Sequence, residues 1–235
     1  MYILKNMKKI LYLFVLAIPF VCAGCEDDRE NSDSAVERMD DGAFYSVSFI
    51  QSYVIADSFE IMHPTGDDQV VYALSSGQQK SGQQYYDVFN DNTFKRRVVP
   101  FTNKAIFNTF VKMDIVSDSD FDEQHKAGAS LSDIVRFVGM SASDYIGSGC
   151  TEAYDWKTVP AIFDAVGWTD HKFGYSPVEM LLSEVGEDDL KLISPMFYLN
   201  FEKQPTLSRM HNLTLTVTDN KGKTLTVTWE QQFGE

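Results

Sequence analysis

Alternation of apolar and polar residues is most regular in two segments near the C-terminal end, residues 212–218 and 223–230. Each segment places Leu, Val or Trp at every second position and mostly Thr between them. A period of two is typical of a strand that buries one face. The intervening residues 219–222 are Asp-Asn-Lys-Gly, and glycine suits a turn position with positive φ. The pattern predicts a β-hairpin whose Leu, Val and Trp face packs on a core.

Weaker alternation predicts further strands at residues 44–55, 69–74, 105–116 and 196–202. In the first of these, we expect the aromatic and aliphatic residues to be buried and Ser46, Ser48 and Ser52 to face water. Residues 76–103 are rich in Gln, Gly, Asn and Asp. They predict a long loop with one irregular strand at 85–89, and long loops of compact domains are often functional.

Residues 117–195 show short helical signals in place of alternation. Ser176, Pro177 and Glu179 have the order of a helix start: an N-cap, a first-turn proline and a capping-box acid. We predict a helix over 176–186, and two shorter helices over 130–138 and 160–166. With strands on both sides of these helices, the expected fold is mainly β: an antiparallel, immunoglobulin-like β-sandwich with short inserted helices.

The N-terminal 24 residues have the anatomy of a secretion signal. Three lysines precede the apolar run 10–21, which is too short to span a bilayer comfortably. Ala23-Gly24-Cys25 then resembles the bacterial lipobox, in which the cysteine is acylated and becomes the first residue. Cys22 stands where that pattern usually has Leu, and acylation at Cys22 itself fits the preceding residues poorly. The alternatives are a short transmembrane anchor or an ordinary cleaved signal.

Acidic residues follow Cys25 directly. Glu26, Asp27 and Asp28 resemble the export signal that Bacteroidota use to send lipoproteins to the cell surface. In enterobacteria, acids at this place can instead favour retention in the inner membrane. We favour the surface reading: a protein of the outer membrane that is anchored by acyl chains such as palmitate at Cys25 and faces the exterior.

Charge and composition limit the partners. Removal of residues 1–24, which hold three lysines and no acid, changes the net charge from −14 to −17. Nucleic acid is not expected as a partner, since phosphate recognition needs clustered Lys and Arg. Residues 26–42 are polar and acidic and predict a flexible tether that spans 25–42. The 44% apolar fraction suits one folded domain over 43–235.

No metal, cofactor or nucleophile motif is complete in the sequence. The four histidines are far apart, so no local zinc site is present. Residues 118–123 place acids at alternate positions, as calcium loops do, but an EF-hand would need glycine where Glu123 stands. Cys150 lies among glycines twenty-one residues before His171, yet a lone cysteine is usually a small buried residue. We predict no cofactor, and an enzyme is the less favoured interpretation.

Two function classes stay open. Tyr154, Trp156 and Trp168 could form an aromatic platform for sugars or peptides, or they could serve only as core. The first hypothesis is a non-catalytic surface module that is adhesive or binds an extracellular glycan or protein, through loops 76–103 and 140–175. The second is a hydrolase of extracellular polymers that uses acidic side chains as acid and base.

The acylation pattern, the acids after it, the chain length and the segment 120–133, DFDEQHKAGASLSD, together resemble a family of uncharacterised Bacteroidota surface lipoproteins. That family is classed only as a domain of unknown function. The resemblance implies a location, and it brings no reaction and no functional residues.

Overall fold

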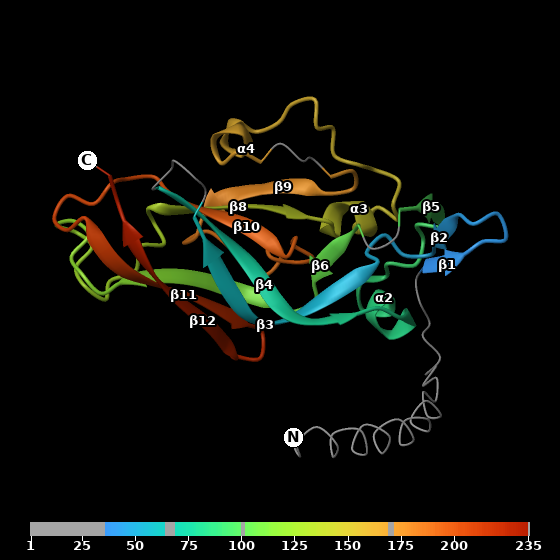
Figure 1. Cartoon of the computed structure of the whole chain (residues 1–235), viewed down its shortest axis with the longest axis horizontal. Helices are drawn as coiled ribbons and strands as arrows, with labels where there is room; N and C mark the ends of the chain where they lie inside the picture. The colour runs from blue at the N-terminus through green and yellow to red at the C-terminus, as the bar shows by residue number, and fades with distance from the viewer. Residues whose placement is uncertain (1–35, 64–68, 100–101, 169–171, 235) are drawn as a thin grey trace, which may run out of the picture. The chain divides into compact units, whose positions relative to one another are not determined.

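The computed structural model describes residues 36–63, 69–99, 102–168 and 172–234. Within these ranges the protein is mainly β, with three sheets and three short helices (Figure 1). The largest sheet, sheet B, has the strand order β6 (Lys104–Ile106), β3 (Ser52–Met62), β4 (Val70–Lys80), β10 (Met196–Phe201), β8 (Val135–Ser141) and β9 (Ser176–Leu181). Its neighbouring strands are antiparallel except β3 and β6, which run parallel.

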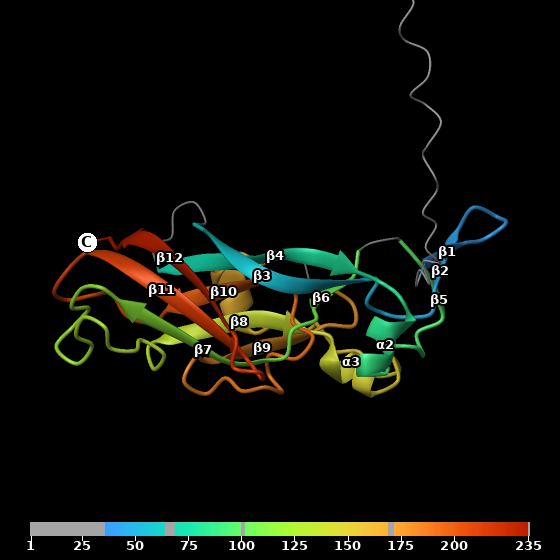
Figure 2. The ribbon, with the colours of Figure 1, turned by 90° about the horizontal axis from the view of Figure 1, so that it is seen from below.

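Two three-stranded antiparallel sheets accompany sheet B. Sheet C has the order β12 (Thr224–Gln232), β11 (Met210–Asp219) and β7 (Phe110–Ser117). Sheet A has the order β1 (Val36–Arg38), β2 (Phe44–Ser46) and β5 (Arg96–Val98). Figure 2 shows sheet A at the end of the folded part that is opposite the C-terminus, beyond β6 and α2.

One face of sheet B packs against sheet C. The residues they share form the inner cluster, which is built from aliphatic side chains, phenylalanines and one tryptophan. Its strand members include Phe59, Val71, Phe137, Phe197, Leu199, Met113, Ile115, Leu213, Leu215, Val217 and Trp229. Two sheets thus face each other around one apolar core, in a sandwich-like layout.

The other face of sheet B is covered by loops and by the helices α2 (Gln83–Phe89), α3 (Ser143–Gly147) and α4 (Ala161–Ala165). This outer cluster contains the buried residues Phe49, Tyr53, Tyr86, Val138, Met140, Tyr145, Phe163, Trp168, Tyr175 and Tyr198, among others. Side chains of one strand alternate between the two clusters. In β10, for example, Phe197 and Leu199 face inward and Tyr198 faces outward.

The predicted C-terminal hairpin is confirmed. β11 and β12 pair from Met210↔Gln232 to Thr218↔Thr224, and Gly222 has a φ of +79° in the turn. Leu213, Leu215 and Val217 are fully buried, whereas the threonines of β12 are exposed. The strand predictions for 69–74 and 196–202 are also confirmed by β4 and β10, although β4 continues to Lys80.

The prediction of one strand over 44–55 is wrong, because the chain leaves β2 and turns before it enters β3. Ser46, Ser48 and Ser52 are buried rather than exposed. The Ser46 hydroxyl donates to the Ser48 carbonyl over 2.7 Å, and the Ser48 hydroxyl donates to the Ile50 carbonyl over 2.8 Å. These serines satisfy the backbone of the connection, as hydroxyl side chains do in turns.

Three further element predictions are wrong. Residues 176–181 form edge strand β9, whose pairing with β8 outweighs the helix-start signal of Ser176, Pro177 and Glu179. Most of the helix predicted over 130–138 is a loop, and β8 begins at Val135. The irregular strand expected at 85–89 lies in helix α2, so residues 76–103 are not one long loop.

The strand predicted over 105–116 is divided, because β6 ends at Ile106 and β7 begins at Phe110. The helix predicted over 160–166 is confirmed by α4.

Ordered structure begins before residue 43, since β1 lies within the predicted tether and pairs with β2. In the described ranges, no helix has the length and apolar character needed to cross a membrane. The predicted signal peptide lies outside the described residues.

Candidate functional site

A cavity of about 470 Å³ opens on the outer side of sheet B. It lies over β4 and β10, beside the start of β6 and against Gly167 and Trp168, which follow α4. Its described lining residues are Leu74, Thr102, Lys104, Gly167, Trp168, Lys172, Ser194, Pro195, Met196 and Tyr198. We call it the outer cavity. Its volume lies within the usual range for small-molecule sites.

The end of α4 places Trp168 at this cavity. Gly167 adopts a left-handed φ of +72°, its N–H donates to the Asp164 carbonyl, and the Trp168 N–H donates to the Phe163 carbonyl over 2.7 Å. This is the Schellman arrangement of a helix C-terminus. It brings the Trp168 ring against Phe163, with ring centroids 5.5 Å apart. The glycine after the predicted helix is the sequence signal for this turn.

Tyr198 supplies a second aromatic wall from β10. Its ring centroid lies 5.0 Å from that of Trp168, and the two planes are inclined by 51°. Trp168 is 4% exposed and Tyr198 is 9% exposed, so each presents only a small part of its ring to the cavity. Burial raises the pKa of Tyr198, which keeps its hydroxyl protonated at neutral pH.

Two lysines line the other side. Lys104 is held by the parallel pairing of β6 with β3, and the Tyr175 hydroxyl donates to its carbonyl over 3.0 Å. The Lys104 ammonium donates to Gln79 over 3.2 Å. Lys172 follows on the segment beyond α4 and is half-buried. The cavity therefore combines aromatic and apolar walls with positive charge.

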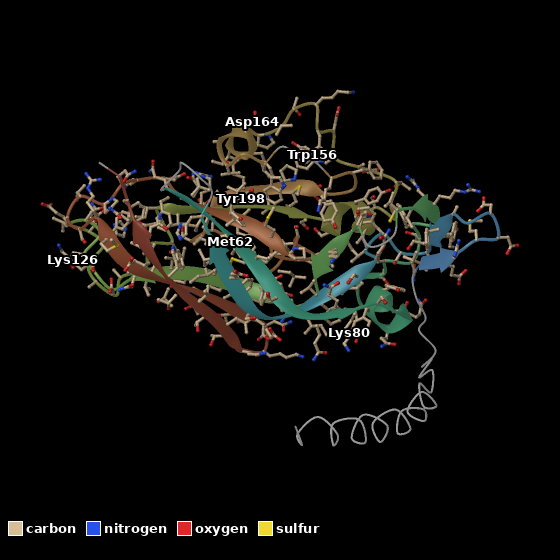
Figure 3. All side chains as sticks on the ribbon, in the orientation of Figure 1. Met62, Lys80, Lys126, Trp156, Asp164 and Tyr198 are labelled. Atoms are coloured by element: carbon tan, nitrogen blue, oxygen red, sulfur yellow. The ribbon has the colours of Figure 1, made fainter. Side chains whose placement is uncertain are left out.

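The structure brings the three aromatic residues predicted as a binding platform into one chain of ring contacts. Tyr154 contacts Trp156 at 5.0 Å, Trp156 contacts Phe163 at 5.7 Å, and Phe163 contacts Trp168. The Trp156 indole N–H donates to the Tyr175 carbonyl over 3.1 Å. Only Tyr154 is exposed, at 36%. Figure 3 labels Trp156 together with Asp164 of α4 and Tyr198 of β10. The group is mostly a packed core with one open end.

A second, smaller cavity of about 270 Å³ lies beside β9. Its described lining includes Asp144, Glu179, Asp188 and Asp189 together with three serines, and no basic residue. The Asp189 carboxylate accepts a hydrogen bond from the Gly186 N–H over 2.9 Å. We call it the acidic cavity.

The acidic loop 118–123 directs its aspartates to different partners. Asp118 accepts hydrogen bonds from the backbone and side chain of Asn212, and Asp120 accepts one from the Ala127 N–H. Asp122 accepts from His125 over 2.8 Å. Hydrogen bonds to Asn212 and Ala127 lower the pKa values of Asp118 and Asp120. Across the described ranges, no group of three or more His, Cys, Asp or Glu could hold a metal ion.

His125 lies between two carboxylates. Its Nδ1 is 2.8 Å from Asp122 and its Nε2 is 3.0 Å from Asp133. Burial alone lowers the pKa of His125, but the hydrogen bonds to Asp122 and Asp133 outweigh burial and raise it. This group stabilises the loop before β8. Of the other histidines, His171 lies outside the described residues and His211 belongs to a buried pair.

That pair, Ser117 and His211, has the contact of a serine and its base. The Ser117 hydroxyl lies 2.8 Å from Nδ1 of His211, and Nε2 of His211 lies 2.9 Å from the Ser208 carbonyl. Both residues are buried, at 2% and 1% exposure, between β7 and β11. A nucleophile must reach its substrate. We therefore interpret the pair as a structural link between two strands.

Cys150 is buried at 3% exposure, and burial raises the pKa of its thiol. A raised pKa disfavours the thiolate, which is the nucleophilic form. The hypothesis of a thiol–imidazole pair gains no support from this environment.

Sequence reasoning missed Asp91. This carboxylate has no exposed surface and accepts hydrogen bonds from the Phe49 N–H at 2.7 Å, the Ile50 N–H at 2.8 Å and the Tyr53 hydroxyl at 3.1 Å. Burial raises the pKa of Asp91 to about 6, although all three hydrogen bonds lower it. Asp91 thereby fixes the connection between β2 and β3. No local pattern marks it, because its partners are about forty residues away in sequence.

The predicted acylation and export residues, Cys25, Glu26, Asp27 and Asp28, lie outside the described residues. No protein-family model, no curated protein and no solved structure matches the chain.

Proposed function

We propose that the protein is a lipid-anchored surface lipoprotein that binds an extracellular glycan or protein without turning it over. The outer cavity is the observation that carries the binding part of this proposal. Trp168 and Tyr198 supply aromatic lining, while Lys104, Lys172 and two hydroxyl residues carry groups that can donate hydrogen bonds. A concave, largely apolar site with a few polar groups is the usual form of a small-ligand site.

The location part of the proposal rests on the N-terminal sequence. The lipobox-like Ala23-Gly24-Cys25 and the acids after it support an acyl anchor and export to the outer surface. The same proposal includes two further points. The chain belongs to the Bacteroidota lipoprotein family that its sequence resembles, and its two facing sheets form an immunoglobulin-like fold.

Anchoring is tested with Cys25→Ala and with Cys22→Ala as the matched control. We expect Cys25→Ala to abolish labelling by a palmitate analogue and to release the protein from the membrane fraction. Cys22→Ala should leave both unchanged. Undiminished labelling of Cys25→Ala would exclude the proposed acylation site.

Binding is tested by presenting the full chain, purified in non-ionic detergent, to an array of glycans and extracellular proteins. Each ligand that binds is then incubated with the protein, and the products are analysed. We expect retention without cleavage. Cleaved product would favour the hydrolase hypothesis, and absence of binding across the array would contradict the proposed function.

A further inference from the structure

The outer cavity differs from the rest of the chain in its charge. The protein has 34 acidic and 20 basic residues, yet the described lining of this cavity includes two lysines and no acid. The acidic cavity shows the opposite composition, with four acids and no base. The positive character of the outer cavity is therefore a local feature, set against a negative molecule.

Among the described residues, the two lysines of the cavity have few partners. Neither Lys104 nor Lys172 forms an ion pair with a described carboxylate, whereas Lys112, Lys126 and Lys157 do. An ammonium group has three donors, and Lys104 uses one on Gln79. An anionic group that enters the cavity would meet two ammonium groups that no described carboxylate pairs with.

The remaining walls favour a ligand with both apolar and hydroxyl surface. Trp168 and Tyr198 contribute aromatic surface, Leu74 and Met196 contribute aliphatic side chains, and Thr102 and Ser194 contribute side chains with hydroxyl groups. A pyranose ring has C–H faces that pack on apolar walls and hydroxyl groups that pair with polar side chains. Aromatic side chains suit such mixed contacts.

The position of the cavity disfavours an extended peptide. A peptide commonly binds by adding a strand to a free sheet edge. The cavity instead lies over β4 and β10, which are central strands with a hydrogen-bonded neighbour on each side. Their backbone groups are already paired, so a peptide would gain no main-chain hydrogen bonds there.

We propose, on the basis of the binding function above, that the outer cavity recognises a saccharide that carries a carboxylate, such as a uronic acid residue. Lys104 and Lys172 pair with the carboxylate, and Trp168 and Tyr198 pack on the sugar ring. The attraction between these two lysines and the carboxylate weakens as salt screens their charges.

The test compares acidic oligosaccharides with their methyl esters, which keep the ring and remove the charge. Oligomers of galacturonate, glucuronate and guluronate and a sialylated oligosaccharide are titrated calorimetrically into the full chain in non-ionic detergent. We expect at least one acid form to bind more tightly than its ester. Lys104→Gln and Lys172→Gln should each weaken that binding about fivefold, and the ester should bind all variants equally.

Lys80→Gln is the matched control. Lys80 lies at the end of β4, away from the cavity lining, and its replacement removes the same charge (Figure 3). It should leave binding unchanged, and thermal unfolding should show that all variants are folded.

The outcomes separate this inference from the proposed function. Equal binding of acid and ester, or binding insensitive to both lysine variants, would overturn the inference and leave a binding module. If only an acidic peptide or protein binds, the ligand class is wrong. If neither these saccharides nor any array ligand binds, the proposed function fails as well.

Discussion

The two faces of sheet B are packed with different chemistry. All five buried tyrosines of the described residues, Tyr53, Tyr86, Tyr145, Tyr175 and Tyr198, belong to the outer cluster, and the inner cluster contains none. The inner face is closed by the regular strands of sheet C. The outer face is closed by loops and short helices, and it holds the outer cavity.

The difference follows from whether the layer that covers each face pairs its own backbone N–H and C=O groups. Strands of sheet C pair their own backbone groups, so apolar side chains suffice between the sheets. Loops leave N–H and C=O groups unpaired, and here the hydroxyls of two tyrosines and the carboxylate of Asp91 bond to such groups. The Tyr86 hydroxyl accepts from the Gly82 N–H over 2.7 Å, and the Tyr175 hydroxyl donates to the Lys104 carbonyl. The contacts that stabilise the inner face are thus mostly apolar, whereas those of the outer face include polar ones.

The largest expected effect is on the inner face. Trp229→Ala should lower the free energy of unfolding by about 3–5 kcal/mol, because truncation of a buried aromatic removes apolar contact and leaves a cavity. Urea unfolding measures this. Thr226→Ala, on the exposed side of the same strand, is the control and should change stability by less than about 0.5 kcal/mol. Similar effects for both variants would contradict the assignment of hairpin faces.

On the outer face, loss of the Asp91 carboxylate should lower the free energy of unfolding almost as much. Asp91→Asn should destabilise by about 2–4 kcal/mol, since an amide nitrogen cannot accept the hydrogen bonds that one carboxylate oxygen receives from Ile50 and Tyr53. Urea unfolding near pH 7 measures the loss. Asp87→Asn, which alters an exposed carboxylate that accepts from Gln83, should have little effect. If the two variants match, Asp91 does not anchor the loop.

The contribution of Asp91 to the free energy of unfolding should depend on pH, unlike the apolar contacts of the inner face. Its pKa of about 6 when folded lies above the ordinary value of 3.8, so the folded state binds the proton more tightly. The contribution of Asp91 to stability is fully present below pH 3.8 and is lost as pH rises through 6. Between pH 5 and pH 7 the expected loss is about 1 kcal/mol.

Other carboxylates also titrate, so the loss is measured as the difference between the wild type and Asp91→Asn. That difference should be larger at pH 5 than at pH 7. A constant difference would show that the folded pKa of Asp91 is not raised. Trp229→Ala should show no such pH dependence relative to the wild type.

The smallest effect is expected at the cavity lining. Lys104→Gln and Lys172→Gln should change the free energy of unfolding by less than about 0.5 kcal/mol, because neither ammonium forms an ion pair with a described carboxylate. Chemical unfolding with Lys80→Gln as a reference measures this. A loss above about 1 kcal/mol would show that these lysines support the fold, and it would complicate their use as binding probes.

The sequence predicted the inner face better than the outer face. Strict alternation in 212–218 and 223–230 marks β11 and β12, because one side of each strand is buried by regular neighbours. The outer face gives no such period. Ser48 and Asp91 are polar residues that suggest exposure, yet both are buried, and the partners of Asp91 are about forty residues away in sequence.

Part of the outer cavity could also be foreseen. Trp168 was a candidate from its residue type, and Gly167 marked the end of α4 that places it. Lys104, Lys172 and Tyr198 could not be selected, since they come from three separate segments that meet only when sheet B is covered. The helix signal at Ser176 failed because local capping preferences are weaker than pairing along a whole strand.

Pro177, which led to the wrong helix prediction, also affects how readily the sheets of separate molecules can pair and aggregate. It lies in β9, an edge of sheet B, and it has no N–H to offer to a strand of another molecule. The opposite edge, β6, is only three residues long. Short edges and edge prolines are poor templates for intermolecular sheet growth. Strand addition by another molecule is therefore disfavoured at β9 and at β6.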